Sequence, residues 1–303
     1  MHRKWLYSFA LVCMAFLQFN CGGCESNSDD DIKFLPQDDM SSTDVNYNSD
    51  AMNEVIGSFS SPVEMAAMLK SSDVPFNNRY LVDPDMVKDY TTSFKRALGL
   101  GVLSADLGYL NVYSKTSMIL DYLVSIRQIT EELKLGQFFD FQSLKRLATS
   151  DDNIDSLLIM CVQSYQNMDE HLRNNQRSNL SALMVTGVWV ESMYLVTQVA
   201  KEQTTEELKN TIGEQKQILN HLLPILKLFV KDTDKNFTEL VQNLEELKEV
   251  LDVVKITVHE KSDLPQRTDG VIEQNEESIV TVSSEELQEI IATTDKIRNK
   301  IIN

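Results

Sequence analysis

The sequence predicts an all-α fold, a multi-helix bundle with a small β-hairpin before the last helix. Hydrophobic residues make up 42% of the 303 positions, whereas only 10 are glycine and 6 are proline. This balance favours long helices over the many turns of a β-sandwich. From residue 61 onward, apolar residues also recur every three or four positions, which is the spacing of one helix face.

The first two helices are predicted from their start signals. Ser61-Pro62-Val63-Glu64 has the pattern of a capping box with proline at the first helical position, and it predicts a short helix as far as Lys70. Asp83-Pro84 predicts the start of a second helix. We expect this helix to continue through a glycine-containing stretch to Tyr113.

The middle of the chain shows further amphipathic or wholly apolar segments of helical length. They predict helices at 116–135 (ending at Gly136), 141–149, 151–174 and 179–202. A second capping box, Thr204-Thr205-Glu206-Glu207, predicts a helix to about Lys231 that Pro224 is expected to kink.

The C-terminal part combines two helices with a predicted hairpin. An apolar stripe from Phe237 to Leu251 predicts the first helix. Residues 255–258 and 278–282 are β-branched and partly alternating, so we expect them to pair as a hairpin with a long, mobile loop between them, all within 255–282. Ser283-Ser284-Glu285-Glu286 then caps the last helix.

The N-terminal residues predict a targeting signal and not a part of the folded domain. His2, Arg3 and Lys4 precede an apolar run from Trp5 to Phe19, which is shorter than the roughly 20 residues of a membrane span. Gly22 and Gly23 then precede Cys24. This plan resembles lipoprotein signal peptides, in which a small residue precedes the cysteine that receives the lipid. We expect residues 1–23 to be removed and Cys24 to be lipidated, with Cys21 as the alternative.

Residues 24–54 are polar, acidic and poor in aromatic side chains, so they cannot bury enough apolar area to offset their chain entropy. They predict a disordered tether. The bundle domain then spans residues 55–303. An acidic cluster directly behind the lipidated cysteine also resembles the export signals of outer-membrane lipoproteins of Bacteroidetes type. We expect an outer-membrane location, on the periplasmic face or on the cell surface.

Composition and motifs exclude several classes of function. A net charge of -18 repels phosphate backbones, so no nucleic acid partner is expected, and membrane attachment must come from the lipid anchor. The sequence holds no H-E-x-x-H, G-x-S-x-G, Walker A or dinucleotide-binding pattern. We therefore expect no enzyme activity, no cofactor and no metal site.

Two buried-looking carboxylates are the candidate functional side chains. Asp106 and Tyr109 follow glycines in an apolar helical segment, where each glycine costs about 1 kcal/mol relative to alanine. Close helix crossing would compensate that cost, and a ligand pocket is the alternative. Glu191 interrupts the apolar run 180–200, which we expect to be a core helix and not a membrane span. If Glu191 and Asp106 faced each other, the pair would share a proton or hold a cation; the sequence leaves open whether they meet.

Four segments resemble a family of uncharacterised helical lipoproteins of Bacteroidetes type, over about residues 55–303. They are Ser61–Glu64, Ala97–Tyr113, Gly136–Ser150 and Gly187–Ala200. The resemblance implies a lipid anchor and a helical domain, and it transfers no catalytic residue.

Together these features predict a non-enzymatic, membrane-anchored lipoprotein of the cell envelope with a binding or structural role. An envelope protein is its expected partner. The alternative is a ligand-binding or hydrolytic helical protein with a carboxylate-lined pocket formed by Asp106, Tyr109 and Glu191.

Overall fold

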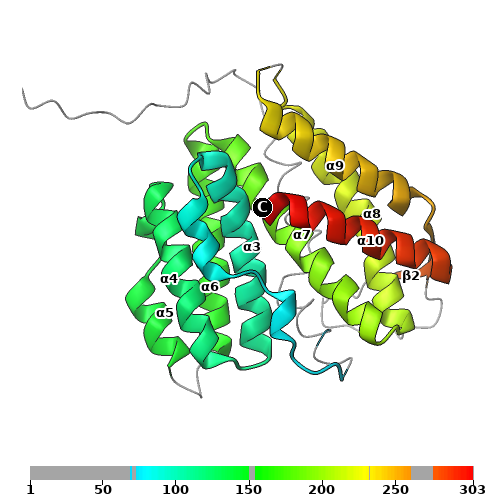
Figure 1. The fold of residues 1–303 in the computed structure, drawn as a ribbon, viewed down its shortest axis with the longest axis horizontal. Coiled ribbons are helices and arrows are strands. Elements are labelled where there is room, and N and C mark those ends of the chain that lie inside the picture. The colour runs from blue at the N-terminus through cyan, green and yellow to red at the C-terminus, as the bar shows by residue number, and fades with distance from the viewer. Residues whose placement is uncertain (1–68, 70–72, 150–153, 232, 261–275, 303) are drawn as a thin grey trace, which may run out of the picture. The chain divides into compact units, whose positions relative to one another are not determined.

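The apolar stripes form helices that pack on one another, which confirms the all-α prediction (Figure 1). The computed structural model describes residues 69, 73–149, 154–231, 233–260 and 276–302, all within the unit formed by residues 42–303. The α-helices are α3 (Ser93–Val112), α4 (Thr116–Glu132), α5 (Phe141–Ala148), α6 (Ile154–Asn174), α7 (Ser178–Glu202), α8 (Glu206–Lys227), α9 (Lys235–Asp252) and α10 (Ser284–Ile302). The 3-10 turns are η1 (Asn78–Tyr80), η2 (Pro84–Asp89) and η3 (Gly136–Phe138).

Helix α7 is the central helix, packed against α3, α6, α8 and α10 (Figure 1). By length and composition it is long and apolar enough to cross a membrane, but 94% of its most apolar stretch is buried inside the bundle. An apolar surface that neighbouring helices cover gains nothing further from lipid. The prediction of a core helix in this segment is therefore confirmed.

Helices α3 and α7 cross at glycine. A Cβ atom on Gly101 would lie 2.1 Å from the backbone oxygen of Met184, and one on Gly187 would lie 2.1 Å from the backbone oxygen of Leu98. Glycine lets the two backbones approach because it has no side chain in the way. Close crossing is thus the compensation for these glycines.

Several predicted helix boundaries are wrong, among them the end of α8, which lies at Lys227 and not near Lys231. The helix expected from Asp83 to Tyr113 is two segments, because extended backbone at Tyr90 and Thr92 separates η2 from α3 and Thr92 caps α3 by accepting from the backbone N–H of Lys95. The N-cap of α8 is Thr205 and not Thr204, whose hydroxyl donates to the backbone oxygen of Ala200.

Helix α4 also ends earlier than predicted. Its last helical residue is Glu132, and the chain turns through Lys134, which has a φ of 60°, before it reaches Gly136. The backbone N–H groups of Lys134 and Leu135 bond to the oxygens of Glu131 and Thr130, which completes the helix end. Gly136 instead begins η3.

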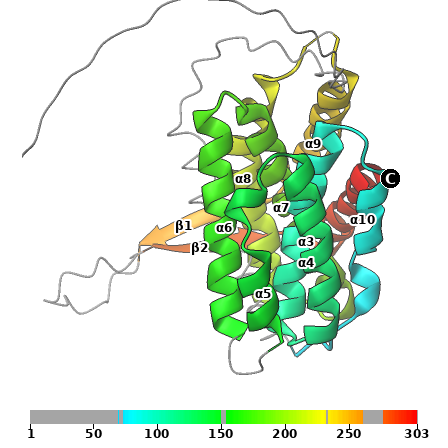
Figure 2. The same ribbon diagram turned by 90° about the vertical axis from the view of Figure 1, so that its left-hand side faces the viewer.

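The predicted hairpin is confirmed. Strands β1 (Lys255–Glu260) and β2 (Glu276–Thr281) pair antiparallel, with Lys255 opposite Thr281 and Ile256 opposite Val280. The hairpin packs on α8 through Val280, and its far end points away from the helices (Figure 2). The capping box of the last helix also forms, since Ser283 and Glu286 bond to each other's backbone N–H groups.

Several predictions fall outside the described residues. These are the signal peptide, both candidate lipidation sites Cys21 and Cys24, the tether, the capping box at residues 61–64 and the hairpin loop.

Candidate functional site: a buried ion cluster and an open groove

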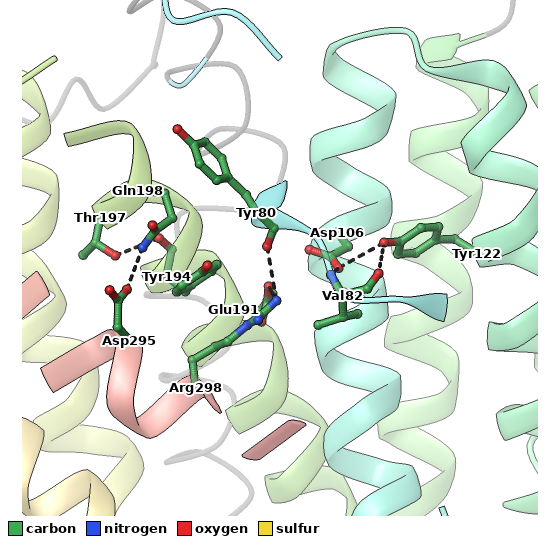
Figure 3. A network of polar contacts seen from close by, with 10 residues as sticks. All are labelled: Tyr80, Val82, Asp106, Tyr122, Glu191, Tyr194, Thr197, Gln198, Asp295 and Arg298. Carbon is green, nitrogen blue, oxygen red and sulfur yellow. Dashed lines mark hydrogen bonds and ion pairs between the residues drawn. The ribbon is translucent and has the colours of Figure 1, made fainter. Parts of the chain in front are cut away.

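Asp106, Glu191 and Arg298 meet in the interior, and we call these three residues the buried ion cluster (Figure 3). They come from α3, α7 and α10, and none of them is more than 5% exposed. Asp106 and Glu191 are within hydrogen-bonding range of each other. The structure therefore answers the question that the sequence left open, because the two carboxyl groups do face each other.

Arg298 compensates the charge of Glu191. Its Nε and Nη2 atoms donate to the two carboxylate oxygens of Glu191 at 2.9 and 2.8 Å, which is the two-pronged geometry that suits a guanidinium and a carboxylate. Nη2 also donates to the backbone oxygen of Tyr80 at 3.2 Å, and the guanidinium lies 4.3 Å from the ring centroid of Tyr194. The cation is thus held from several sides.

Asp106 is held by the segment between η1 and η2. Its Oδ2 accepts from the backbone N–H of Val82 at 3.0 Å and lies 3.5 Å from the hydroxyl of Tyr122, which donates to the backbone oxygen of Val82. Its Oδ1 is buried and receives no hydrogen bond from a donor in the described part of the chain. One oxygen of this carboxyl group is therefore satisfied and the other is not.

Burial dominates the acid–base behaviour of the cluster. Desolvation raises the pKa of Asp106 well above its ordinary value, and the neighbouring Glu191 raises it further. Desolvation also raises the pKa of Glu191, against the lowering effect of its bond to Arg298. The pKa of Arg298 is raised, because its hydrogen bonds and attraction to Glu191 outweigh its own desolvation.

Tyr109 lies in a different cluster. Its hydroxyl accepts from the backbone N–H of Asn77 at 3.2 Å, and its ring packs against Phe76, Tyr80 and Tyr113. Burial raises the pKa of its hydroxyl group. The structure thus brings together two of the three predicted site residues and places the third among aromatic rings.

An open groove lies between the end of α7, the start of α8 and one face of α10, with a volume of about 620 Å³. Its lining combines charged, hydroxyl and apolar groups: Ala200, Lys201, Thr204, Lys209, Ser284, Leu287, Gln288, Ile291, Ala292 and Asp295. Asp295 accepts from Gln198 at 2.6 Å and pairs with Lys201 (Figure 3 shows the bond to Gln198). Asp106, Tyr109 and Glu191 are absent from this lining.

Sequence reasoning did not single out Arg298, although the sequence carries a signal for it. Ile290, Ile291 and Ile297 define the buried face of α10, and Arg298 lies seven residues after Ile291, on the same face. A charge on the apolar face of a helix implies a buried partner, because an unpaired buried charge is costly. Glu191 was the obvious candidate for that partner.

Among the described residues, no group of three or more histidine, cysteine, aspartate or glutamate side chains is placed to hold a metal ion. Comparison with protein-family models, with curated protein sequences and with solved structures finds no match to this chain.

Proposed function

We propose that this chain is a non-enzymatic lipoprotein of the cell envelope, held at the outer membrane by a fatty-acylated cysteine and carrying a helical domain with a binding or structural role. The observation that carries the proposal is the basic start, short apolar run and Gly22-Gly23-Cys24 sequence at the N-terminus. The acidic residues that follow Cys24 support a tether between the lipid and the helical domain.

Two features of the helical domain support the proposal. The apolar length of α7 is covered by other helices, so a lipid on the N-terminal cysteine supplies the attachment that α7 does not. Asp106 and Glu191 are fully buried, and Glu191 is already bound by Arg298 through both oxygens. Carboxylates in that position bond to groups of the interior and are not presented to a substrate.

A binding role belongs to an exposed surface. The groove between α7, α8 and α10 offers lysine, hydroxyl and amide groups beside apolar side chains, which is the mixed lining that small ligands and protein partners use. The buried ion cluster contributes to that role by fixing α10, which forms one wall of the groove.

Metabolic labelling with radioactive palmitate tests the anchor. In bacteria that produce the full chain, we expect label on the wild-type protein and its loss in Cys24→Ala, because the thiol of Cys24 is the proposed acceptor. Cys161→Ala is the matched control, since Cys161 lies in α6 and burial raises its pKa to about 12. If the label is lost in Cys21→Ala and kept in Cys24→Ala, the lipidated residue is Cys21. A wild-type protein without label, found soluble with its first residues intact, contradicts the proposal.

A further inference from the structure

We infer that Asp106 is a neutral carboxylic acid in the folded protein, and that its Oδ1 holds a proton and donates it to Glu191. The cluster then has no net charge, because it combines this carboxylic acid with the carboxylate of Glu191 and the guanidinium of Arg298. It holds α10 against α3 and α7. This is a proton-binding site built into the interior, and it goes beyond the proposed envelope role.

The hydrogen bonds of Asp106 place the proton. Oδ2 already accepts from the backbone N–H of Val82, whereas Oδ1 is buried and receives no hydrogen bond from any donor that the structure describes. The neighbouring carboxyl group of Glu191 is in hydrogen-bonding range, and a carboxylate can only accept. Two buried acceptors that face each other repel, and a proton on one of them turns that repulsion into a hydrogen bond.

The proton belongs on Asp106 and not on Glu191. Both oxygens of Glu191 accept from Arg298, and each retains a lone pair for a further bond. A proton on Glu191 would weaken the ion pair and leave the buried guanidinium without a full counter-charge. Among the described residues, no cation bonds directly to Asp106. Protonating Asp106 therefore costs less free energy than protonating Glu191.

The other ionisable side chains around the cluster are tyrosines, and they add no charge to it near neutral pH. The ionisable side chains that face it are Tyr122 from α4, Tyr194 from α7 and Tyr90 from the end of η2. Burial raises the pKa of all three hydroxyl groups, that of Tyr90 to about 12. They therefore stay neutral near neutral pH, and the proton of Asp106 is the one that the cluster can lose.

The sign of the pH dependence follows from this proton. An unfolded aspartate loses its proton at about pH 4, while folded Asp106 keeps it to a higher pH because burial raises its pKa. Between these two values the folded state holds one proton more than the unfolded state. In that pH range this one proton makes the unfolding equilibrium constant rise about tenfold per pH unit, so stability falls as the pH rises.

Asp106→Asn tests the inference, because its amide can accept from Val82 and donate to Glu191 without a titrating proton. Urea unfolding of the full chain is measured from about pH 6 to pH 9. We expect the ratio of unfolding constants, wild type to variant, to rise with pH, by about tenfold per pH unit wherever folded Asp106 still holds its proton and the unfolded chain has lost it. Asp169→Asn is the matched control: Asp169 is 3% exposed and Ser181 and Arg173 already donate to its two oxygens, so its curve should run parallel to the wild type.

Infrared difference spectroscopy gives a direct reading on the wild-type protein, even where a variant does not fold. We expect a carbonyl stretch of a protonated carboxylic acid at neutral pH, shifted in heavy water and absent from Asp106→Asn. No such band, together with parallel stability curves, would mean that Asp106 is ionised and hydrated. Stability that depends on sodium or potassium at constant ionic strength, only when Asp106 is present, would mean that a cation occupies the site. Either result overturns the inference.

Discussion

Arg298 lies inside the bundle because Glu191 meets it there. Removing a guanidinium and a carboxylate from water costs several kcal/mol for each ion, and their attraction offsets that cost only when the geometry is good and the remaining donors find partners. Both conditions hold here, since Arg298 binds both oxygens of Glu191 and the backbone oxygen of Tyr80. The intact ion pair therefore contributes little net stability, whereas removing one partner leaves the other charge buried without compensation and destabilises the fold.

Glu191→Gln should therefore destabilise the protein by about 3–5 kcal/mol, because it leaves Arg298 buried without its counter-charge. The measurement is the free energy of unfolding in urea at neutral pH. Glu246→Gln is the matched control, since Glu246 also pairs with a cation of α10, Lys296, but at the surface with 40% of its side chain exposed. There we expect a loss below about 1 kcal/mol. Equal losses in the two variants would show that Arg298 finds other compensation.

At the scale of one residue, the sequence predicts the type of environment better than the partner. Glu191 in an apolar run implies a buried carboxylate, and the structure has one. That Asp106 meets it depends on the register of α3 against α7, which the glycines of that crossing set and which no local pattern encodes. Tyr109 is three residues after Asp106, close enough to suggest a shared pocket, yet its ring packs with Phe76 and Tyr113.

At the scale of the element, helix existence follows from the period of the apolar residues, and helix ends do not. Thr204 and Thr205 both fit a cap, and the side chain that reaches the free N–H of Leu208 belongs to Thr205. The turn after α4 takes its positive φ at Lys134, although lysine seldom adopts one and Gly136 stands two residues later. Such choices depend on which apolar residues the neighbouring helices cover, and a single stretch of sequence does not contain that information.

Gly101→Ala tests the crossing of α3 and α7. The added methyl group would lie 2.1 Å from the backbone oxygen of Met184 and 2.6 Å from the backbone nitrogen of Val188, so the two helices must separate. We expect a loss of about 1–3 kcal/mol in the free energy of unfolding, since overpacking outweighs the roughly 1 kcal/mol that alanine gains in a helix.

Gly136→Ala is the control for that substitution. A Cβ atom on Gly136 would lie 3.2 Å from the Cγ atom of Glu131. This side chain is 55% exposed and pairs with Arg127 at the surface, so a small shift relieves the contact. We expect a change within about 0.5 kcal/mol. If both alanine variants unfold at the same urea concentration as the wild type, the close approach at Gly101 is not a constraint on the fold.

At the scale of the whole helical unit, α7 links two groups of helices. It contacts α3 and α6 in one group and α8 and α10 in the other (Figure 1). The buried ion cluster joins α3, α7 and α10 (Figure 3). The buried apolar side chains form one cluster that extends through all of these helices. A protein with one continuous core should lose it in one step.

Trp189 provides the probe for that expectation. It is fully buried on α7, and its Nε1 donates to Oε1 of Gln215 on α8 at 3.0 Å. The other tryptophan, Trp5, lies in the predicted signal peptide, so tryptophan fluorescence of the processed protein reports on α7 alone. We expect urea unfolding followed by this fluorescence to coincide with unfolding followed by far-ultraviolet circular dichroism, which reports on all helices. A fluorescence change that precedes the loss of helix would show that α8 and α10 leave α7 before α3 to α6 unfold, and that the core consists of two units.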